Sequence, residues 1–169
     1  MAVTSDFGIS VSVKNTKASD LSAAADDLVK RYGVHLESGT GAGKADRVFA
    51  DTRTLAASAN ETLDLAGSLT DAYGATTSFA RIKFILIAAA GGNTNNVVVG
   101  ANASADFVGL LNAAGTITLR PSMCFAAMCG SADPTGMVVT ATTADLIKIA
   151  NSAGGTSVMY DVIIVGNST

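Results

Sequence analysis

From Glu61 onward the chain is a series of short apolar segments separated by clusters of turn-forming residues, and this alternation is what most limits the fold. The clusters include Gly91-Gly92-Asn93 and the run from Gly130 to Gly136. Many short strands with no helical pattern between them favour an antiparallel β-sandwich over β-α-β units, whose parallel strands need crossovers. We therefore expect a mainly β fold. The expected strands are residues 79–87, 97–99, 117–119, 123–128, 136–140, 146–149 and 158–165.

Two of these segments are apolar on both faces. Residues 79–87 begin by alternating polar and apolar side chains, with Arg81 and Lys83 on one face, and end in the apolar run Ile85-Leu86-Ile87. Residues 158–165 carry apolar side chains at nearly every position. A strand buried on both faces belongs inside a sheet, so we expect residues 158–165 to form a central strand.

The N-terminal region has a different pattern. Residues 9–14 alternate as a half-buried strand does, and Ser19 is suited to cap a helix. Gly33 follows Lys30 and Arg31 as a C-terminal stop would. We expect residues 1–60 to form an N-terminal arm with one short helix and an extended segment, residues 61–169 to form the sandwich, and the two to make one structural domain. The residues at helical spacing are Leu21, Ala24, Ala25, Leu28 and Val29.

Composition excludes several classes of protein. Hydrophobic residues make up 49% of the 169 residues and charged residues 15%, which is incompatible with intrinsic disorder. The net charge of −3 argues against direct binding of nucleic acid or an anionic membrane surface. The apolar run from Phe84 to Ala90 is far too short to span a bilayer, and the first ten residues do not resemble an export signal.

Charge is distributed unevenly along the chain. The second half, residues 84–169, holds only two of the 11 Lys and Arg residues and four of the 14 Asp and Glu residues. Its polar surface must consist largely of Thr, Ser, Asn, Gly and Ala. A β surface with so few charges is prone to edge-to-edge association unless another molecule covers it. We therefore expect a protein partner, including further copies of the chain as a dimer or trimer.

The segment Gly39 to Lys44, with the sequence GTGAGK, raises the question of phosphate binding. The P-loop pattern requires a glycine where Ser38 stands and a hydroxyl where Ala45 stands. Without that hydroxyl the loop provides no ligand for magnesium. We interpret the segment as a flexible glycine loop, and keep a ligand-binding domain using the Gly39-Lys44 loop as an alternative function.

Groups suited to catalysis are few, and we expect no enzyme activity. His35 is the one histidine, and a surface role is expected for it. Cys124 and Cys129 are five residues apart, which places them on opposite faces of a strand, and we expect two free thiols. We assign no catalytic, cofactor-binding or metal-ligating residue and no cofactor.

Other polar and aromatic groups have simple interpretations. Arg47 and Arg53 alternate with acidic residues and are expected to form ion pairs. Phe79 is expected in the core, whereas Tyr73 is a candidate for lining a shallow carbohydrate site. The loop oxygens considered for calcium, which match no known loop pattern, are those of Asp64, Asp71, Asn93, Asn95 and Asn96.

Five blocks of the chain stand out within roughly residues 37 to 166: residues 39–56, 63–74, 79–87, 145–152 and 160–166. Together they resemble a family of small structural proteins of tailed-bacteriophage virions. The resemblance implies a β-sandwich or jelly-roll protein located in the virion, with a capsid decoration (cement) protein as the first choice, the major capsid protein as its partner, and no catalytic residues. A tail or fibre-base component is the alternative.

Overall fold

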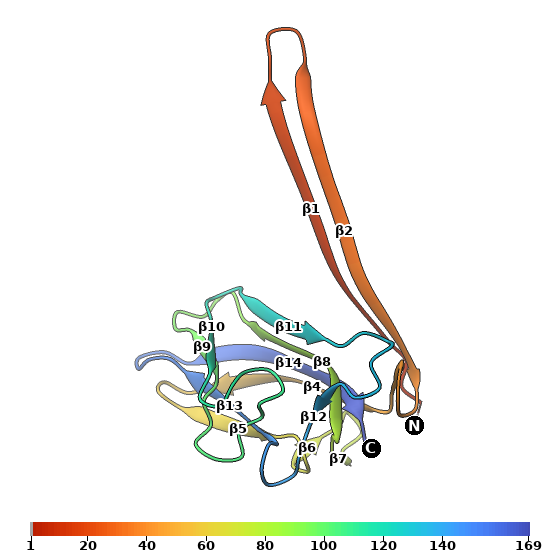
Figure 1. Cartoon of the computed structure of the whole chain (residues 1–169). Helices are drawn as coiled ribbons and strands as arrows, with labels where there is room; N and C mark the ends of the chain where they lie inside the picture. The colour runs from red at the N-terminus through yellow and green to blue at the C-terminus, as the bar shows by residue number, and fades with distance from the viewer. Residues whose placement is uncertain (1) are drawn as a thin grey trace.

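The computed structural model describes residues 2–169, and every regular element in that range is a β-strand. Figure 1 shows two parts, a long two-stranded hairpin and a two-sheet body from whose end the hairpin projects. The mainly β fold with antiparallel sheets is confirmed. The prediction of a short helix is wrong.

The residues expected to be helical lie in the hairpin. It consists of β1 (Ser5–Ala18) and β2 (Ala23–Ser38), paired antiparallel from Ser5 opposite Leu36 to Ala18 opposite Ala23. Ser19, expected to cap a helix, instead closes the turn, because its backbone nitrogen and its Oγ donate to the carbonyl of Ser22 at 2.8 and 2.7 Å. A short isolated helix is marginal in water, whereas the β1 partner satisfies the β2 backbone along its length.

One sheet of the body has β14 at its centre, flanked by β8 and β4, with β11 and β12 both pairing with β8. The prediction that residues 158–165 form a central strand is confirmed. All pairs within this sheet are antiparallel. Its strands are β4 (Arg47–Leu55), β8 (Arg81–Ala89), β11 (Cys124–Met128), β12 (Met137–Val138) and β14 (Val158–Asn167).

The second sheet has four antiparallel strands in the order β10, β9, β13, β5. These are β5 (Asn60–Asp64), β9 (Val97–Gly100), β10 (Thr116–Leu119) and β13 (Leu146–Asn151). Two short pieces complete the fold: β3 (Lys44–Ala45), parallel to the end of β2, and the pair of β6 (Leu69–Thr70) with β7 (Thr76–Thr77).

A single large core lies between the two sheets. Side chains at alternate positions of β8 and β14, such as Ile85 and Val162, pack with Val99 of β9 and Ile149 of β13, and each is at most 1% exposed. Strand β4 pairs with β14 and contributes Phe49 and Leu55 to this core, so part of the N-terminal 60 residues is integral to the body.

Lys83 departs from the expected pattern of β8. Its side chain is 1% exposed, and Nζ donates to the carbonyl of Asp133 at 2.6 Å. The β8–β14 register shifts here, since Phe84 is opposite Val165 and Ile82 is opposite Gly166, leaving Lys83 without a β14 partner. The extra residue of a β-bulge re-aims a side chain, which accounts for Lys83 being buried while Arg81, expected on the same face, is only partly so.

Candidate protein-docking surface

The hairpin has two chemically different faces. Side chains directly opposite each other in an antiparallel pair share a face. One face therefore combines the apolar residues of β1 with those opposite them in β2, and we call it the apolar face. It contains the pairs Phe7 and Val34, Ile9 and Tyr32, Val11 and Lys30, and Val13 and Leu28. The opposite face carries mainly polar pairs, such as Asp6 and His35, Ser10 and Arg31, and Lys14 and Asp27.

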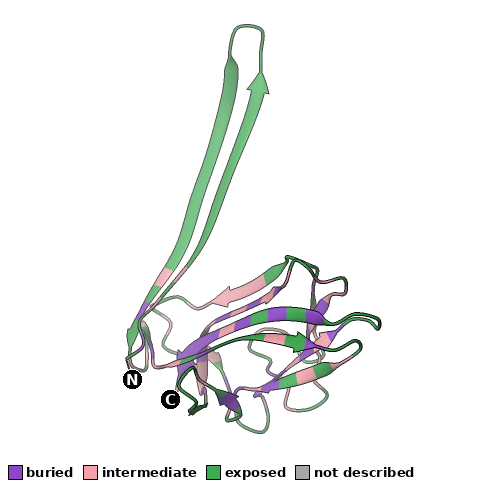
Figure 2. Ribbon diagram, turned by 180° about the vertical axis from the view of Figure 1, so that it is seen from behind, coloured by how far each residue is buried: buried purple, intermediate pink, exposed green. Residues whose placement is uncertain are grey.

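Most of the apolar face is in contact with solvent. The exposed fractions are 46% for Ile9, 51% for Val13 and 60% for Tyr32. Every residue from Gly8 to Gly33 is exposed, and Figure 2 shows both strands exposed from near the base to the tip. An isolated two-stranded ribbon is at best marginally stable in water. A ribbon of this length with one apolar face is therefore a surface suited to being covered by protein.

The base of the apolar face does have a partner within the chain. Phe7 stacks on Phe84 of β8, with ring centroids 4.1 Å apart and an interplanar angle of 5°. Phe7 and Val34 also pack against a small cluster formed by Leu36, Ala45 and Val165. The hairpin thus begins by packing its apolar side on the side of the five-stranded sheet that faces away from the main core.

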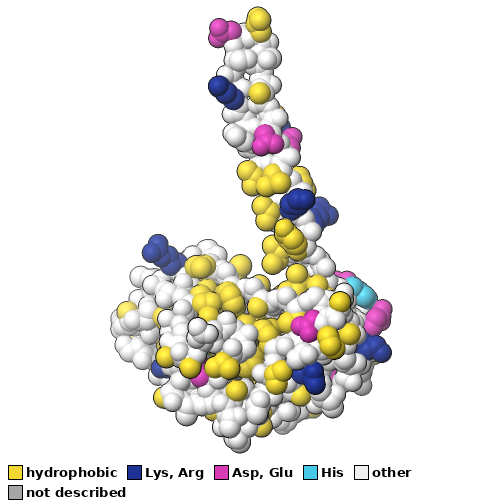
Figure 3. Space-filling view, in the orientation of Figure 1, with side chains coloured by type: hydrophobic (Ala, Val, Ile, Leu, Met, Phe, Trp, Pro, Cys, Tyr) yellow, Lys and Arg dark blue, Asp and Glu magenta, His cyan; other side chains and the backbone are white. Residues whose placement is uncertain are grey.

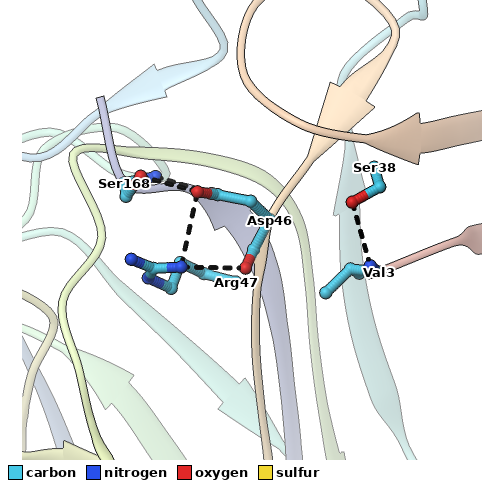
Figure 4. A network of polar contacts seen from close by, with 5 residues as sticks. All are labelled: Val3, Ser38, Asp46, Arg47 and Ser168. Carbon is cyan, nitrogen blue, oxygen red and sulfur yellow. Dashed lines mark hydrogen bonds and ion pairs between the residues drawn. The ribbon is translucent and has the colours of Figure 1, made fainter. Parts of the chain in front are cut away.

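Polar contacts fix the same base (Figure 4). The backbone nitrogen of Val3 donates to Ser38 Oγ at 3.2 Å. Asp46, just after β3, accepts from the backbone nitrogen and the hydroxyl of Ser168 at 2.8 and 2.6 Å. Arg47 Nη1 donates to the Asp46 carbonyl at 3.1 Å. Both ends of the chain are therefore tied to the point where the hairpin leaves the body.

The five-stranded sheet exposes an apolar outer face, which we define by three cross-strand rows. The register aligns Met128, Phe84, Val165 and Val48 in the first row, and Ala126, Leu86, Ile163 and Ala50 in the second. The third row contains Cys124, Ala88, Asp161 and Thr52. Within these rows Asp161 is the one charged side chain.

The outer face is partly open and continues the apolar side of the hairpin. Of its first two rows only Val165 is buried, and it is the residue that the hairpin base covers. A shallow groove of about 590 Å³ lies over Ala50, Leu86 and Ile163. In Figure 3 hydrophobic side chains gather on the lower part of the hairpin and on the body beneath it. The apolar face and the outer face together form the two walls of an open corner.

The polar face of the hairpin carries a small charged cluster near the base. His35 Nδ1 lies 2.7 Å from Asp6 Oδ1, and Nε2 lies 3.0 Å from Glu37 Oε1. The hydrogen bond to Asp6, followed by that to Glu37, raises the pKa of His35 above its usual 6.5. All three side chains are at least half exposed, in agreement with the surface role expected for His35.

The Gly39-Lys44 loop uses its backbone groups within the protein. Gly39 N donates to the Ala45 carbonyl at 3.0 Å, and Glu37 N donates to the Gly43 carbonyl at 2.9 Å. Asn167, fully buried and oriented with its amide nitrogen toward the Lys44 carbonyl, accepts from Gly41 N at 3.0 Å. Gly39, Gly41 and Gly43 all have positive φ angles, which glycine adopts without strain. The glycines thus serve the turn that connects β2 to β3.

Arg47 and Arg53 form intrachain ion pairs, as expected. Arg53 pairs with Asp51 at 3.1 Å and with Glu61 Oε2, and its guanidinium lies 5.7 Å from the centroid of Phe49. Glu61 Oε1 also accepts from the hydroxyl of Tyr160 at 2.8 Å. Burial, together with this hydrogen bond, raises the pKa of Tyr160, which keeps the hydroxyl a donor. The network joins the edges of the two sheets.

The oxygens considered for calcium lie in three places along the chain: at the end of β5, in the turn between β6 and β7, and in the loop between β8 and β9. Asp64 Oδ1 accepts from Ala66 N at 2.9 Å, and Asp71 Oδ1 accepts from the backbone nitrogens of Tyr73 and Ala75 at 2.9 Å. Asn93 exchanges two hydrogen bonds with the Met159 backbone, and the Asn95 amide donates to Asn151 and neighbouring carbonyls. Within residues 2–169 no three His, Cys, Asp or Glu side chains are grouped as metal ligands.

The remaining candidates are two aromatic residues and the two cysteines. Phe79 is 2% exposed and lies in the main core, as expected, whereas Tyr73 is 79% exposed. Tyr73 borders an open cavity of about 510 Å³ near Asp46 and Arg47. Cys124 and Cys129 are free thiols, as expected, and burial raises the pKa of Cys129. Within residues 2–169 there is no helix with the length and apolar character needed to span a membrane.

Sequence reasoning missed the apolar face of the hairpin. Part of the signal was present, because Tyr32, Val34 and Leu36 alternate with Arg31, Gly33 and His35 much as residues 9–14 alternate. The helical spacing at residues 21–29 obscured it. Pairing the two alternating segments across the polar turn at residues 19–22 would have placed their apolar residues on one face.

Comparison with known proteins gives no match: no protein family, no curated protein and no solved structure is significantly similar to this chain.

Proposed function

We propose that this protein is a structural subunit of a tailed-bacteriophage virion, and that it acts as a capsid decoration protein which binds the major capsid protein shell and stabilises it. The observation that carries the proposal is the open corner formed by the apolar face of the hairpin and the outer face of the five-stranded sheet. Such a surface is a liability in a free monomer and an interface in an assembly.

The geometry of the hairpin supports an assembly role over a catalytic one. Strands of 14 and 16 residues extend away from the body, and each covers a distance of about 45 to 55 Å at about 3.3 Å per residue. A projection of this length reaches well beyond its own body to a neighbouring subunit. Its charged cluster of Asp6, His35 and Glu37 lies at the base and is at least half exposed.

The order of the strands supports a jelly-roll-like sandwich, the fold that the resemblance implies. Successive strands pass repeatedly between the two sheets: β4 to β5, β8 to β9, β10 to β11, β12 to β13 and β13 to β14. Jelly rolls, which are common in viral capsid proteins, are double-sheet folds with connections of this kind. The charge-poor second half of the chain forms most of this body and is suited to contact with other protein surfaces.

Co-sedimentation with virion parts tests the proposal. The purified protein is mixed separately with capsid shells and with tails of the phage whose virion carries it, and binding is followed by centrifugation. We expect saturable binding to shells and a higher temperature of shell disruption when the protein is bound. Binding to tails alone would favour the tail or fibre-base alternative. Failure to bind either would refute a virion role.

The ligand-binding alternative has its own test. If the Gly39-Lys44 loop held phosphates, Lys44→Ala would weaken binding of ATP or GTP measured by calorimetry. We expect no measurable heat for the parent protein with either nucleotide, because Gly39 N and Gly41 N are already engaged. Micromolar affinity that Lys44→Ala abolishes would favour the alternative.

A further inference from the structure

The chain carries two uncovered apolar surfaces, and its own hairpin covers only the edge of one. Phe7 and Val34 pack the hairpin base onto the sheet beside Phe84 and Val165. Beyond the base the two strands project away from the body (Figure 1), and every residue from Gly8 to Gly33 is exposed. The base is attached to the body where β2 pairs with β3 and where Phe7 stacks on Phe84.

We infer that a second copy of the chain covers these surfaces: the apolar face of the hairpin of one copy lies on the outer face of the five-stranded sheet of the next. The contact at the hairpin base within one copy supports this arrangement, because it has the same chemistry. There, apolar side chains of the ribbon pack on apolar side chains of the same sheet face. The second copy extends that contact over Ile9, Val11, Val13, Leu28 and Tyr32.

The charges on the two surfaces are complementary. The apolar face carries Lys30 between its apolar pairs, and the outer face carries Asp161 in its third row. Both side chains are exposed, and Asp161 accepts one hydrogen bond, from Thr52 Oγ1 at 2.6 Å. Lys30 of one copy and Asp161 of the next would pair within an otherwise apolar contact. Two hairpins packed face to face would instead bring their lysines together.

The area that the two surfaces can bury is also large enough for a specific interface. Strand β8 has nine residues, so the sheet offers about 30 Å of contact length, and a two-stranded ribbon is about 10 Å wide. Each contact covers roughly 300–450 Å² on either side. Where two copies exchange hairpins reciprocally, each copy gives one hairpin and receives one in the same interface, so roughly 600–900 Å² per copy is covered, near the about 800 Å² per partner of specific interfaces. A reciprocal exchange of this kind is closed by a two-fold axis.

Cysteine cross-linking tests the contact, and the chain supplies one of the thiols. Cys124 is exposed at one edge of the outer face, and Ala50→Cys adds a thiol at the other edge. In a Cys129→Ser background, Ile9→Cys, Val11→Cys and Val13→Cys are made one at a time and treated with a short bis-maleimide. We expect links between the hairpin cysteine of one copy and a sheet cysteine of another, located by peptide mapping.

Matched controls come from the polar face of the same strand. Ser10→Cys and Ser12→Cys lie between the test positions but point the other way, and we expect them to give at least tenfold less product. Adding Cys124→Ser to variants that lack Ala50→Cys should abolish the product. Product that persists there and joins two hairpin cysteines would contradict the inference in favour of hairpins packed on each other.

Association in solution provides an independent readout. Light scattering should find the parent protein as an oligomer, Val11→Asp with Val13→Asp as a monomer, and Ser10→Asp with Ser12→Asp as the same oligomer as the parent. All four positions are exposed, so the body folds in each variant. A parent that remains monomeric at a concentration of about 100 μM would overturn the inference.

The inference goes beyond the proposed function, and their failures are distinguishable. Copies that cross-link as described but bind neither shells nor tails would leave the contact between copies intact and refute the virion role. A parent monomer that binds shells, with the aspartate variants at the Val positions losing that binding, would support the virion role and refute the contact between copies.

Discussion

Tyr160 is fully buried at the centre of the five-stranded sheet, and its hydroxyl donates to Glu61 at the edge of the other sheet. Removing that hydroxyl leaves the ring in place and deletes one hydrogen bond to a charged acceptor that water partly reaches. Tyr160→Phe should therefore lower the free energy of unfolding by about 1 kcal/mol, measured by urea denaturation. Tyr32→Phe, at a 60% exposed position of the hairpin, is the control and should change it by less than about 0.3 kcal/mol. Equal effects would contradict the assigned role of the Glu61 contact.

His35 links the two hairpin strands through a group that titrates. Its pKa in the folded protein is raised above 6.5, chiefly by the hydrogen bond to Asp6 and then by Glu37. The charged cluster therefore stabilises the hairpin base fully below about pH 6.5, and this contribution is lost as the pH rises through the folded-state pKa. Amide hydrogen exchange near Asp6 and His35, corrected for its intrinsic pH dependence, should become faster over that window.

The matched variant for this titration is Asp6→Asn, which removes the charge but keeps the shape. It should bring the His35 pKa, measured by NMR, closer to 6.5. A parent pKa at or below 6.5 would contradict the geometry of the cluster.

Strands β8 and β14 could be predicted from the sequence because their apolar residues outnumber what one face can hold, a pattern that a central strand explains. Strand β2 was not predicted, because Leu28 and Val29, together with Leu21 of the preceding turn, fit helical spacing. The deciding contact is with β1, and pairing is a non-local property that local spacing does not contain. The docking surface could be predicted only in part for the same reason. The small number of charged residues in the second half of the chain predicted a surface covered by a partner, but only the strand register shows which residues lie together on it.

The close approach of β8 and β14 at the β-bulge can be tested by adding one methyl group. A Cβ at Gly166 would lie 2.1 Å from the Arg81 carbonyl oxygen, a distance that the backbone cannot accommodate without moving. Gly166→Ala should lower the free energy of unfolding by about 2–3 kcal/mol. Gly67→Ala is the control, because a Cβ there meets nothing within 4 Å, and it should be nearly neutral. Thermal and urea unfolding of the two variants measure the difference, and a neutral Gly166→Ala would show that the two strands are not so close.

The hairpin and the body should be separable in stability. Gly8 and Gly33 are directly opposite each other, so replacing residues 9–32 by Asn-Gly closes a short hairpin at that pair. All the residues removed are exposed, and we expect the melting temperature of the body to change by less than about 3 °C at a concentration where both proteins are monomeric. Loss of the folded body on truncation, seen by circular dichroism, would mean that the hairpin supports the core.

The same truncated protein should lose association between copies, since it lacks the apolar face but keeps the outer face of the sheet. We propose that the stable body carries a ribbon whose apolar side is completed by other subunits. A protein that kept its oligomeric state after truncation would place the contact between copies elsewhere on the body.

A cryo-electron-microscopy reconstruction of the virion tests this claim most directly, because it shows what lies against residues 9–32. We predict the protein on the capsid, with the side chains of Ile9, Val11 and Val13 buried against the five-stranded sheet of an adjacent copy. A particle in which both faces of the hairpin are surrounded by solvent, with no other subunit on the outer face of the sheet, would contradict it.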